Sequence, residues 1–80
     1  MEKLEPYTAS MGRVLRAQRN QKGFSQEELA HRVGLDRTYI SLLERGLRLP
    51  TLGTLVKLSG ALDIPPEDFV AELGRPYKVD

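Results

Sequence analysis

The chain has 80 residues, of which 40% are hydrophobic and 29% are charged, and its formal net charge is +1. A chain of this length forms one domain with a modest core, which leaves no room for a catalytic domain beside a binding domain. It contains no cysteine, so disulfides, thiolate metal ligands and thiol nucleophiles are excluded. The start of the chain lacks the apolar run of a signal peptide, and no later stretch is long enough to span a membrane. We therefore expect a cytoplasmic protein with no membrane partner.

Charge is distributed unevenly along the chain. The segment from Gly12 to Arg48 carries eight basic and four acidic residues, a net charge of +4, whereas the balance from Leu49 onward is −2. One end of the domain is therefore suited to a polyanion such as DNA, and the other to solvent or a partner. Scattered charges on solvated helix faces explain so modest an asymmetry equally well, so charge alone does not decide the function.

Glycine and proline residues divide the chain into segments that fit five short helices. The first is predicted at residues 10–22, where it begins at Ser10 and is ended by Gly23. The residues of its apolar face are Met11, Val14, Leu15 and Gln18. The other face is basic, and Arg13 and Arg16 on it are interpreted as solvated arginines.

The second and third predicted helices each begin with a capping signal. Ser25 and Glu28 have the spacing of a capping box, in which each side chain bonds to the backbone of the other residue. Asp36 is expected to cap the third helix, which should end near Gly46. Between the two helices, Gly34 can adopt the left-handed conformation that a tight turn needs. So short a connection predicts that the two helices pack at a steep angle.

Two further helices are predicted after Pro50. Thr51 is expected to cap the fourth, and Pro66 is expected to open the fifth. The side chains expected to point inward are Leu52, Leu55, Val56 and Leu62 from the fourth helix, and Phe69 and Leu73 from the fifth. Because no segment alternates in the way of a half-buried strand, the predicted fold class is all-α.

The exposed face of the third predicted helix carries side chains that suit DNA. They are Arg37, Thr38, Ser41, Leu42 and Arg45. Guanidinium, hydroxyl and methyl groups on one helix face can enter the major groove and bond to base edges and phosphates. The second and third helices together therefore predict a helix-turn-helix.

Three segments of the chain resemble a known family. Ser25–Ala30, Val33–Leu35 and Arg37–Gly46 are similar to the Cro/phage-repressor, or xenobiotic-response-element, type of helix-turn-helix regulator. The resemblance covers residues 11–73 and extends to Pro50 and Leu55. It implies a compact five-helix lambda-repressor-like DNA-binding domain over residues 10–74, preceded by an N-terminal extension at residues 1–9 and followed by a C-terminal tail at residues 75–80.

Carried over position by position, the resemblance implies two groups of DNA contacts. The base-reading residues are Arg37, Thr38, Ser41 and Leu42. The phosphate contacts are Gln26, Tyr39, Arg45 and Arg48. Gln26 is also expected to brace the recognition helix, and Arg37 suits bidentate bonding to guanine. Leu42 departs from the polar residue common at its position, so contact with a thymine methyl and loss of direct readout both stay open there.

The remaining conspicuous residues are given structural or surface roles. The resemblance implies that Arg19 and Glu44 form a semi-buried structural pair between the first and third helices. His31, the one histidine, is expected on the outer face of the second helix and has no second ligand at metal spacing. Without a cysteine, a glycine-rich phosphate loop or paired carboxylates, we expect no catalytic residues, no metal and no cofactor, and hence no enzyme.

The resemblance implies a sequence-specific transcriptional regulator that binds double-stranded DNA as a homodimer on a pseudo-palindromic operator. Two kinds stay open, namely an autoregulatory controller of a restriction-modification system and a repressor of phage or plasmid type. The alternative function is that of a DNA-binding antitoxin or a protein-interaction adaptor with the same fold. The sequence does not determine whether binding represses or activates transcription.

The sequence gives weaker indications about protein partners. The fourth and fifth helices are the expected dimer surface, where the surplus apolar residues are Leu58, Val70, Tyr77 and Val79. RNA polymerase is a further partner if Glu67, Asp68 and Glu72 form an acidic contact, although these residues serve equally well as solubilising charges. A toxin is the partner that the antitoxin alternative requires.

Overall fold

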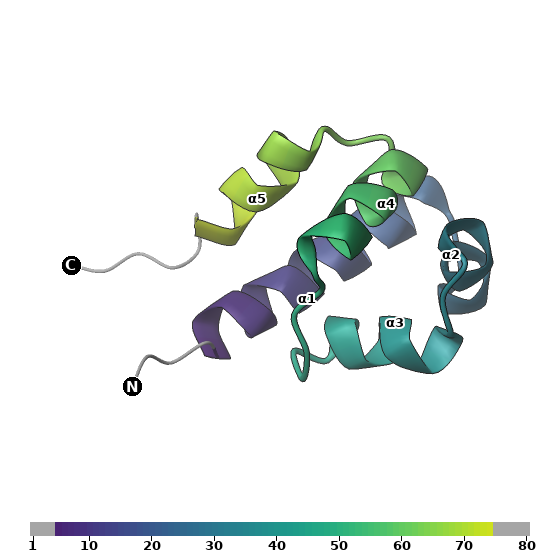
Figure 1. Cartoon of the computed structure of the whole chain (residues 1–80), viewed down its shortest axis with the longest axis horizontal. Coiled ribbons are helices and arrows are strands. Elements are labelled where there is room, and N and C mark those ends of the chain that lie inside the picture. The colour runs from purple at the N-terminus through teal and green to yellow at the C-terminus, as the bar shows by residue number, and fades with distance from the viewer. Residues whose placement is uncertain (1–4, 75–80) are drawn as a thin grey trace.

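The structure is a computed structural model of the chain in which residues 5–74 are described, and in that range it consists of five helices and no strand (Figure 1). The helices are α1 (Glu5–Lys22), α2 (Gln26–Val33), α3 (Arg37–Glu44), α4 (Leu52–Leu62) and α5 (Pro66–Gly74). Helix α1 packs against α3 and α5, α2 packs against α3 and α4, and α4 packs against α5. The predicted all-α, five-helix fold is confirmed.

The first helix begins earlier than the sequence pattern predicted. It starts at Glu5, inside the segment expected to be an N-terminal extension, and not at Ser10. Proline is tolerated in a first helical turn, so Pro6 does not stop the chain from being helical there. Ser10 instead lies within the helix, where it is 1% exposed and its hydroxyl accepts a hydrogen bond from Arg13 at 3.3 Å. The prediction that Ser10 opens the helix is therefore wrong.

The predicted helix ends are otherwise mostly confirmed. Gly23 and Gly34 both adopt left-handed backbone conformations, with φ of 76° and 71°. The capping box is complete, because the Glu28 amide donates to the Ser25 hydroxyl and the Ser25 amide donates to the Glu28 carboxylate, each at 2.9 Å. Asp36 occupies the N-cap position of α3, but its carboxylate makes no capping hydrogen bond.

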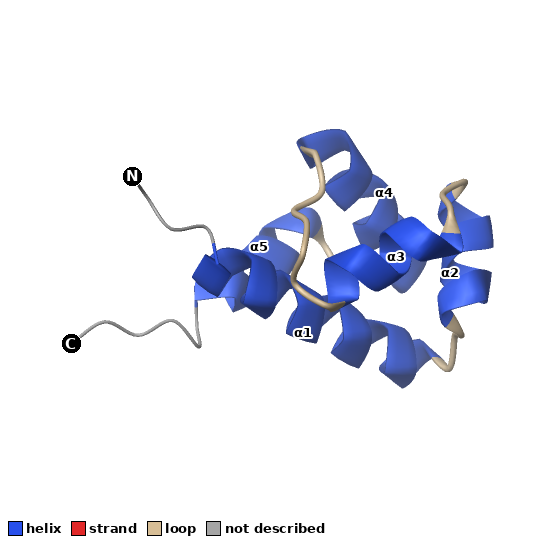
Figure 2. Cartoon of the chain, turned by 90° about the horizontal axis from the view of Figure 1, so that it is seen from below, coloured by secondary structure: helices blue, strands red, loops and turns tan. Residues whose placement is uncertain are grey.

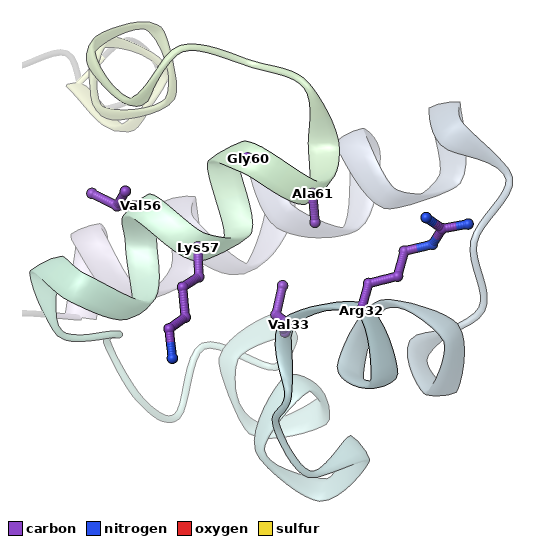
Figure 3. A pocket seen from close by; sticks show the side chains of 6 residues that line it. All are labelled: Arg32, Val33, Val56, Lys57, Gly60 and Ala61. Carbon is purple, nitrogen blue, oxygen red and sulfur yellow. The ribbon is translucent and has the colours of Figure 1, made fainter.

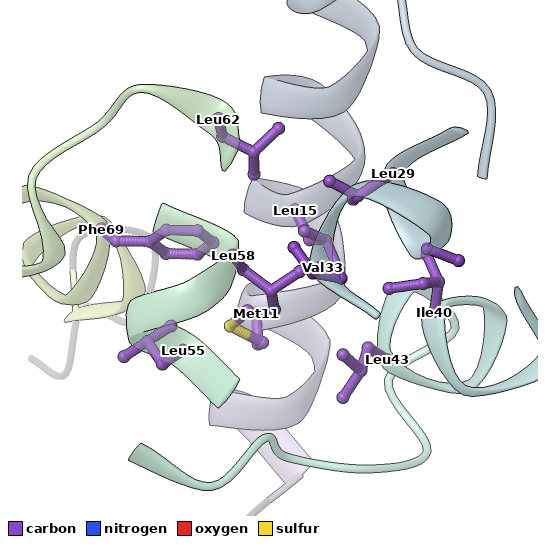
Figure 4. Packing of buried hydrophobic residues seen from close by; sticks show 11 residues of the cluster. Met11, Leu15, Leu29, Val33, Ile40, Leu43, Leu55, Leu58, Leu62 and Phe69 are labelled. Carbon is purple, nitrogen blue, oxygen red and sulfur yellow. The ribbon is translucent and has the colours of Figure 1, made fainter. Parts of the chain in front are cut away.

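One hydrophobic core joins all five helices (Figure 4). It consists of Met11 and Leu15 from α1, Leu29, Ala30 and Val33 from α2, Ile40 and Leu43 from α3, Leu55, Leu58 and Leu62 from α4, and Phe69 from α5. Val14 and Leu73, both predicted to be core residues, are partly buried against this cluster. Such a core predicts that the five helices unfold together.

Three predictions for α4 are wrong. Leu58 was expected on a dimer surface but is completely buried, whereas Leu52 and Val56, expected in the core, are 76% and 50% exposed. The helix carries apolar residues at helical spacing on two faces, so periodicity alone did not determine which face is buried. Packing against α1 and α5 buries the face that carries Leu55, Leu58 and Leu62.

Helices α1 and α3 approach closely at Gly12. A β-carbon at this position would meet the backbone carbonyl oxygen of Glu44 and would lie 2.8 Å from that of Leu43. The α1 backbone thus lies directly against the last turn of α3. In the view from below, α3 lies in front of the helices that support it (Figure 2). This contact sets the distance between α1 and the last turn of α3. The opposite face of α3 stays exposed to solvent.

Candidate nucleic-acid interface

The open face of α3 carries the side chains that were predicted to contact DNA. Arg37, Thr38 and Arg45 are exposed, and Ser41 and Leu42 are half-buried beside them. The Arg45 Nε donates to the Ser41 hydroxyl at 3.2 Å, which links the last turn of the helix to the turn before it. Arg48 is exposed in the connection between α3 and α4. The structure therefore gathers the predicted base contacts and two of the four predicted phosphate contacts on one face or beside it.

Tyr39 lies on a different side of α3 from these residues. It is half-buried and packs against the hydrophobic core. Because an aromatic side chain with one buried face can keep its hydroxyl in solvent, this placement is compatible with both a packing and a phosphate-binding role. The phosphate contact stays a prediction.

Gln26, the first residue of α2, bonds to two residues of α3. Its amide nitrogen donates to Glu44 Oε1 at 3.0 Å, and its amide oxygen accepts from Arg37 Nη1 at 3.3 Å. Gln26 thus braces the third helix at both ends, in the way that the resemblance implied. The bond to Arg37 is exposed, so it orients this guanidinium without removing it from solvent.

The Glu44 carboxylate is the centre of a polar network among α1, α2 and α3. Its side chain is 0% exposed, and it accepts hydrogen bonds from Arg19 Nε at 2.6 Å and from Arg19 Nη2 at 2.9 Å. Gln26 and Arg16 also donate to it, the latter from Nε at 3.4 Å. Arg19 Nη1 bonds in addition to the Phe24 carbonyl at 2.7 Å, where α1 gives way to α2. A buried ion pair is tolerated when its remaining donors and acceptors are satisfied in this way.

The charge state of this pair follows from its bonding. Burial by itself raises the pKa of Glu44, but the hydrogen bonds from Arg19 and Gln26, together with the charge of Arg19, outweigh burial and hold that pKa below its ordinary value. The hydrogen bond to Glu44 raises the pKa of Arg19 above its ordinary value, against the opposing effect of burial. Both side chains are therefore charged at neutral pH.

The surface between α2 and α4 differs in character from the outer face of α3. A hollow of about 530 Å³ between α2 and α4 is lined by Arg32, Val33, Val56, Lys57, Gly60 and Ala61 (Figure 3). This lining pairs two cationic side chains with apolar groups and contains no carboxylate, histidine or hydroxyl side chain. His31 is exposed, and within residues 5–74 no three His, Cys, Asp or Glu side chains come together as metal ligands would. No helix of this described range has the length and apolar character needed to cross a membrane.

The comparison with known proteins agrees with the geometry of α2 and α3. Residues 15–69, which include both helices, match the protein family described as Helix-turn-helix. The chain belongs to the helix-turn-helix family. Helix α3 is accordingly the second helix of the motif, and the bonds of Glu44 to Arg19 and Gln26 hold it against α1 and α2.

Known helix-turn-helix proteins resemble the chain in sequence and in structure. The control protein C.BamHI of Bacillus amyloliquefaciens is 43% identical over 51 residues, which are 64% of this chain and 63% of that protein. The restriction-modification controller protein C.AhdI from Aeromonas hydrophila is 45% identical, with a TM-score of 0.74 over 78% of this chain and 94% of that chain. The restriction-modification controller protein C.Esp1396I has been solved as a tetramer in complex with its natural 35 base-pair operator. It is 33% identical, with a TM-score of 0.75 over 86% of this chain and 91% of that chain. The chain thus spans less than two thirds of the curated relative but most of both solved controllers.

Two residues of α1 that contact α3 were not identified from the sequence. Gly12 lies where α1 meets α3, and the signal for it was a glycine inside an otherwise helical pattern, which costs stability unless close packing requires it. Arg16 was interpreted as a solvated arginine, yet it bonds to Glu44. Its spacing of three residues from Arg19 places both on one helix face, and that was the available signal.

Proposed function

We propose that the chain is a transcriptional regulator that binds a pseudo-palindromic DNA operator as a homodimer and places α3 in the major groove of each half-site. The observation that carries this proposal is the outer face of α3, which is exposed and basic and is braced from behind by Gln26 and Glu44. A rigid helix that presents guanidinium and hydroxyl groups is suited to bonding with base edges. The operator complex of the relative C.Esp1396I supports the same conclusion.

The contacts divide into base-reading and positioning residues. Arg37 pairs with guanine, and Thr38, Ser41 and Leu42 complete the base contacts in the groove. Gln26, Tyr39, Arg45 and Arg48 bind phosphates, which fixes the register of the helix but carries no sequence information. The bond between Gln26 and Arg37 couples the two groups, because the residue that holds a phosphate also orients the residue that reads a base.

Dimerisation uses an exposed apolar strip on α4 and α5, which we define as Leu52, Val56, Pro66 and Val70. Leu52 and Val56 lie four residues apart on one face of α4, and Pro66 and Val70 do the same on α5. A hollow lined by both Val56 and Pro66 joins the two pairs. Leu58 has no part in this surface because it is buried, and Tyr77 and Val79 lie outside the described residues.

A symmetric dimer built in this way supplies two recognition helices to half-sites about 34 Å apart. This is the separation of one turn of DNA, so both helices meet the same side of the duplex. One domain contacts too few base pairs for strong discrimination, which is why the second protomer matters for specificity.

Among the alternatives, the comparisons favour a controller of the restriction-modification type, since C.AhdI and C.Esp1396I both match most of the chain. A phage-type or plasmid-type repressor uses the same interface. Contacts with RNA polymerase through Glu67, Asp68 and Glu72, and a toxin partner, stay predictions without further support.

The test is a salt series of binding to a fluorescent duplex from the promoter of the protein's own gene, with a scrambled duplex for comparison. Wild type should bind the promoter duplex preferentially, with two chains per site and a steep loss of affinity as salt rises. Arg37→Ala should weaken promoter binding by about tenfold or more and reduce the preference over the scrambled duplex, since a bidentate base contact contributes about 1–3 kcal/mol of discrimination.

Arg13→Ala is the matched control for Arg37→Ala. It removes an exposed arginine from α1, so it should lower affinity slightly and leave the sequence preference unchanged. Equal binding of wild type to both duplexes, with no effect of Arg37→Ala, would contradict the proposed function.

A further inference from the structure

Arg16 and Gln26 converge on a single oxygen atom. Arg16 Nε lies 3.4 Å from Glu44 Oε1, and Gln26 Nε2 lies 3.0 Å from the same oxygen. The two side chains come from α1 and α2, so the buried carboxylate of α3 holds together groups from all three helices. We propose that Arg16 is a further phosphate-binding residue. Its guanidinium group, on α1, bonds to the DNA backbone next to the phosphate that Gln26 binds. This inference rests on the proposed function.

The two arginines that bond to Glu44 differ in how many of their guanidinium nitrogens are available to bond outside the domain. Arg19 is 12% exposed, and its Nε, Nη1 and Nη2 all donate within the domain. Arg16 is 56% exposed, and among the contacts of the described residues it donates through Nε alone. Arg19 is therefore a structural residue, whereas the two terminal nitrogens of Arg16 can bond to an external anion.

The charges of the network leave a positive excess beside Arg16. Glu44 contributes one negative charge, which Arg19 balances in a fully hydrogen-bonded pair. The charge of Arg16 is thus left over, and Gln26 connects this position to the charge of Arg37. A guanidinium group that is held at Nε and open at both terminal nitrogens suits the bidentate geometry of a phosphate group.

The position of Arg16 follows from the chain of contacts. Arg16, Glu44, Gln26 and Arg37 form a continuous series in which each residue bonds to the next, and the series ends at the proposed base-reading arginine. A phosphate at Gln26 therefore lies within reach of Arg16 on one side while Arg37 enters the groove on the other. This contact would add a third helix to an interface otherwise made by α2, α3 and the connection that follows α3.

The experiment compares Arg16→Gln with Arg13→Gln in the salt series on the promoter duplex. Both changes remove one charge from an exposed arginine of α1, so general electrostatic attraction is reduced alike. If Arg16 binds a phosphate in each protomer, the slope of log affinity against log salt should fall by about 2 per dimer, since each released phosphate contact contributes about 0.9. Arg13→Gln should change the slope by much less. Arg16→Lys, which keeps the charge, should retain most of the slope.

Several outcomes separate a DNA contact from a structural role. Preference for promoter over scrambled DNA should persist in Arg16→Gln, because phosphate contacts are not sequence-specific. If the slope of Arg16→Gln equals that of Arg13→Gln while wild type binds normally, this inference is overturned and the proposed function stands. A lowered melting temperature with an unchanged slope also overturns it, because Arg16 then acts only within the domain. If wild type itself does not prefer the promoter duplex, the proposed function fails and the inference fails with it.

Discussion

The α1–α2–α3 region and the α4–α5 region are held in place by different kinds of interaction. In the last turn of α3, the buried carboxylate of Glu44 accepts hydrogen bonds from two arginines and a glutamine. In α4 and α5, the packing is apolar around Leu58, Leu62 and Phe69. Hydrogen bonds are directional and apolar burial is not. The first region thus has its geometry specified closely, as the proposed base recognition would require, whereas the proposed dimer surface of the second region requires only that α4 and α5 are packed and present an apolar strip.

The largest effect is expected when the centre of the polar region is removed. Glu44→Ala would leave Arg19, which is 12% exposed, charged and without its carboxylate. Breaking a buried pair from one side costs about 4 kcal/mol, so the free energy of unfolding should fall by about that amount. Urea denaturation of Glu44→Ala and of Glu67→Ala, an exposed control on α5, measures it. A loss of less than about 1 kcal/mol for Glu44→Ala would contradict this prediction, because Arg19 would then tolerate the loss of its buried partner.

The loss of stability of the wild-type protein at acid pH is a second measure of the Arg19–Glu44 pair. Because the folded pKa of Glu44 lies below its ordinary value near 4.5, the unfolded chain binds the proton first as pH falls. The stability from Glu44 is therefore complete above the unfolded pKa and is lost as pH falls through the folded pKa. Glu44→Gln has no such group, so its stability should fall less steeply than that of wild type in this range.

A somewhat smaller loss in the free energy of unfolding is expected from a substitution where α1 contacts α3. Gly12→Ala would place a methyl group against the backbone carbonyl groups of Glu44 and Leu43, which cannot rotate aside. Overpacking of this kind costs about 3 kcal/mol, and it would push the recognition helix outward, so operator affinity should fall as well. Denaturation and the duplex titration together check this prediction.

Gly60→Ala is the matched control in the apolar region. Gly60 is in the exposed part of α4, where an added β-carbon would meet nothing within 4 Å. Alanine in a helix is favoured over glycine by about 1 kcal/mol, so this variant should be more stable than wild type. If Gly12→Ala and Gly60→Ala changed the free energy of unfolding in the same direction, the proposed difference between the two glycines would be wrong.

The difference between the regions also explains what the sequence predicted well. The helix-turn-helix is marked by local signals, such as the capping box at Ser25 and the left-handed turn at Gly34, which depend on neighbouring residues alone. These signals predicted α2 and α3 nearly to the residue. Arg19 and Glu44 were paired only through the family resemblance, since they are far apart in sequence and nothing local connects them.

The start of α1 was misplaced for a local reason, but the errors in α4 and at Gly12 occurred where contacts between distant segments decide the structure. Leu58 and Val56 are both apolar and only two residues apart, and it is the packing of α1 and α5 that buries the first and exposes the second. Gly12 was marked only as a glycine inside a helical pattern, and its role depends on carbonyl groups of α3 that are distant in the sequence. Sequence periodicity identifies a helix, but it does not identify the face that tertiary packing buries.

The smallest effect on folding, and the sharpest test of the second region, is expected from Val70→Asp in the apolar strip. Val70 is 48% exposed, so a charge there should change the free energy of unfolding of the monomer by about 0.5 kcal/mol or less. In a dimer interface the same charge loses its water, and association should fail. Light scattering coupled to gel filtration should therefore find a dimer for wild type and a folded monomer for Val70→Asp, with weaker operator binding by the monomer. Lys57→Gln, which also lowers the net charge by one at an exposed position of α4 outside the strip, controls for charge. A dimer that survives Val70→Asp would place the interface elsewhere, and the apolar region would then serve only to complete the core.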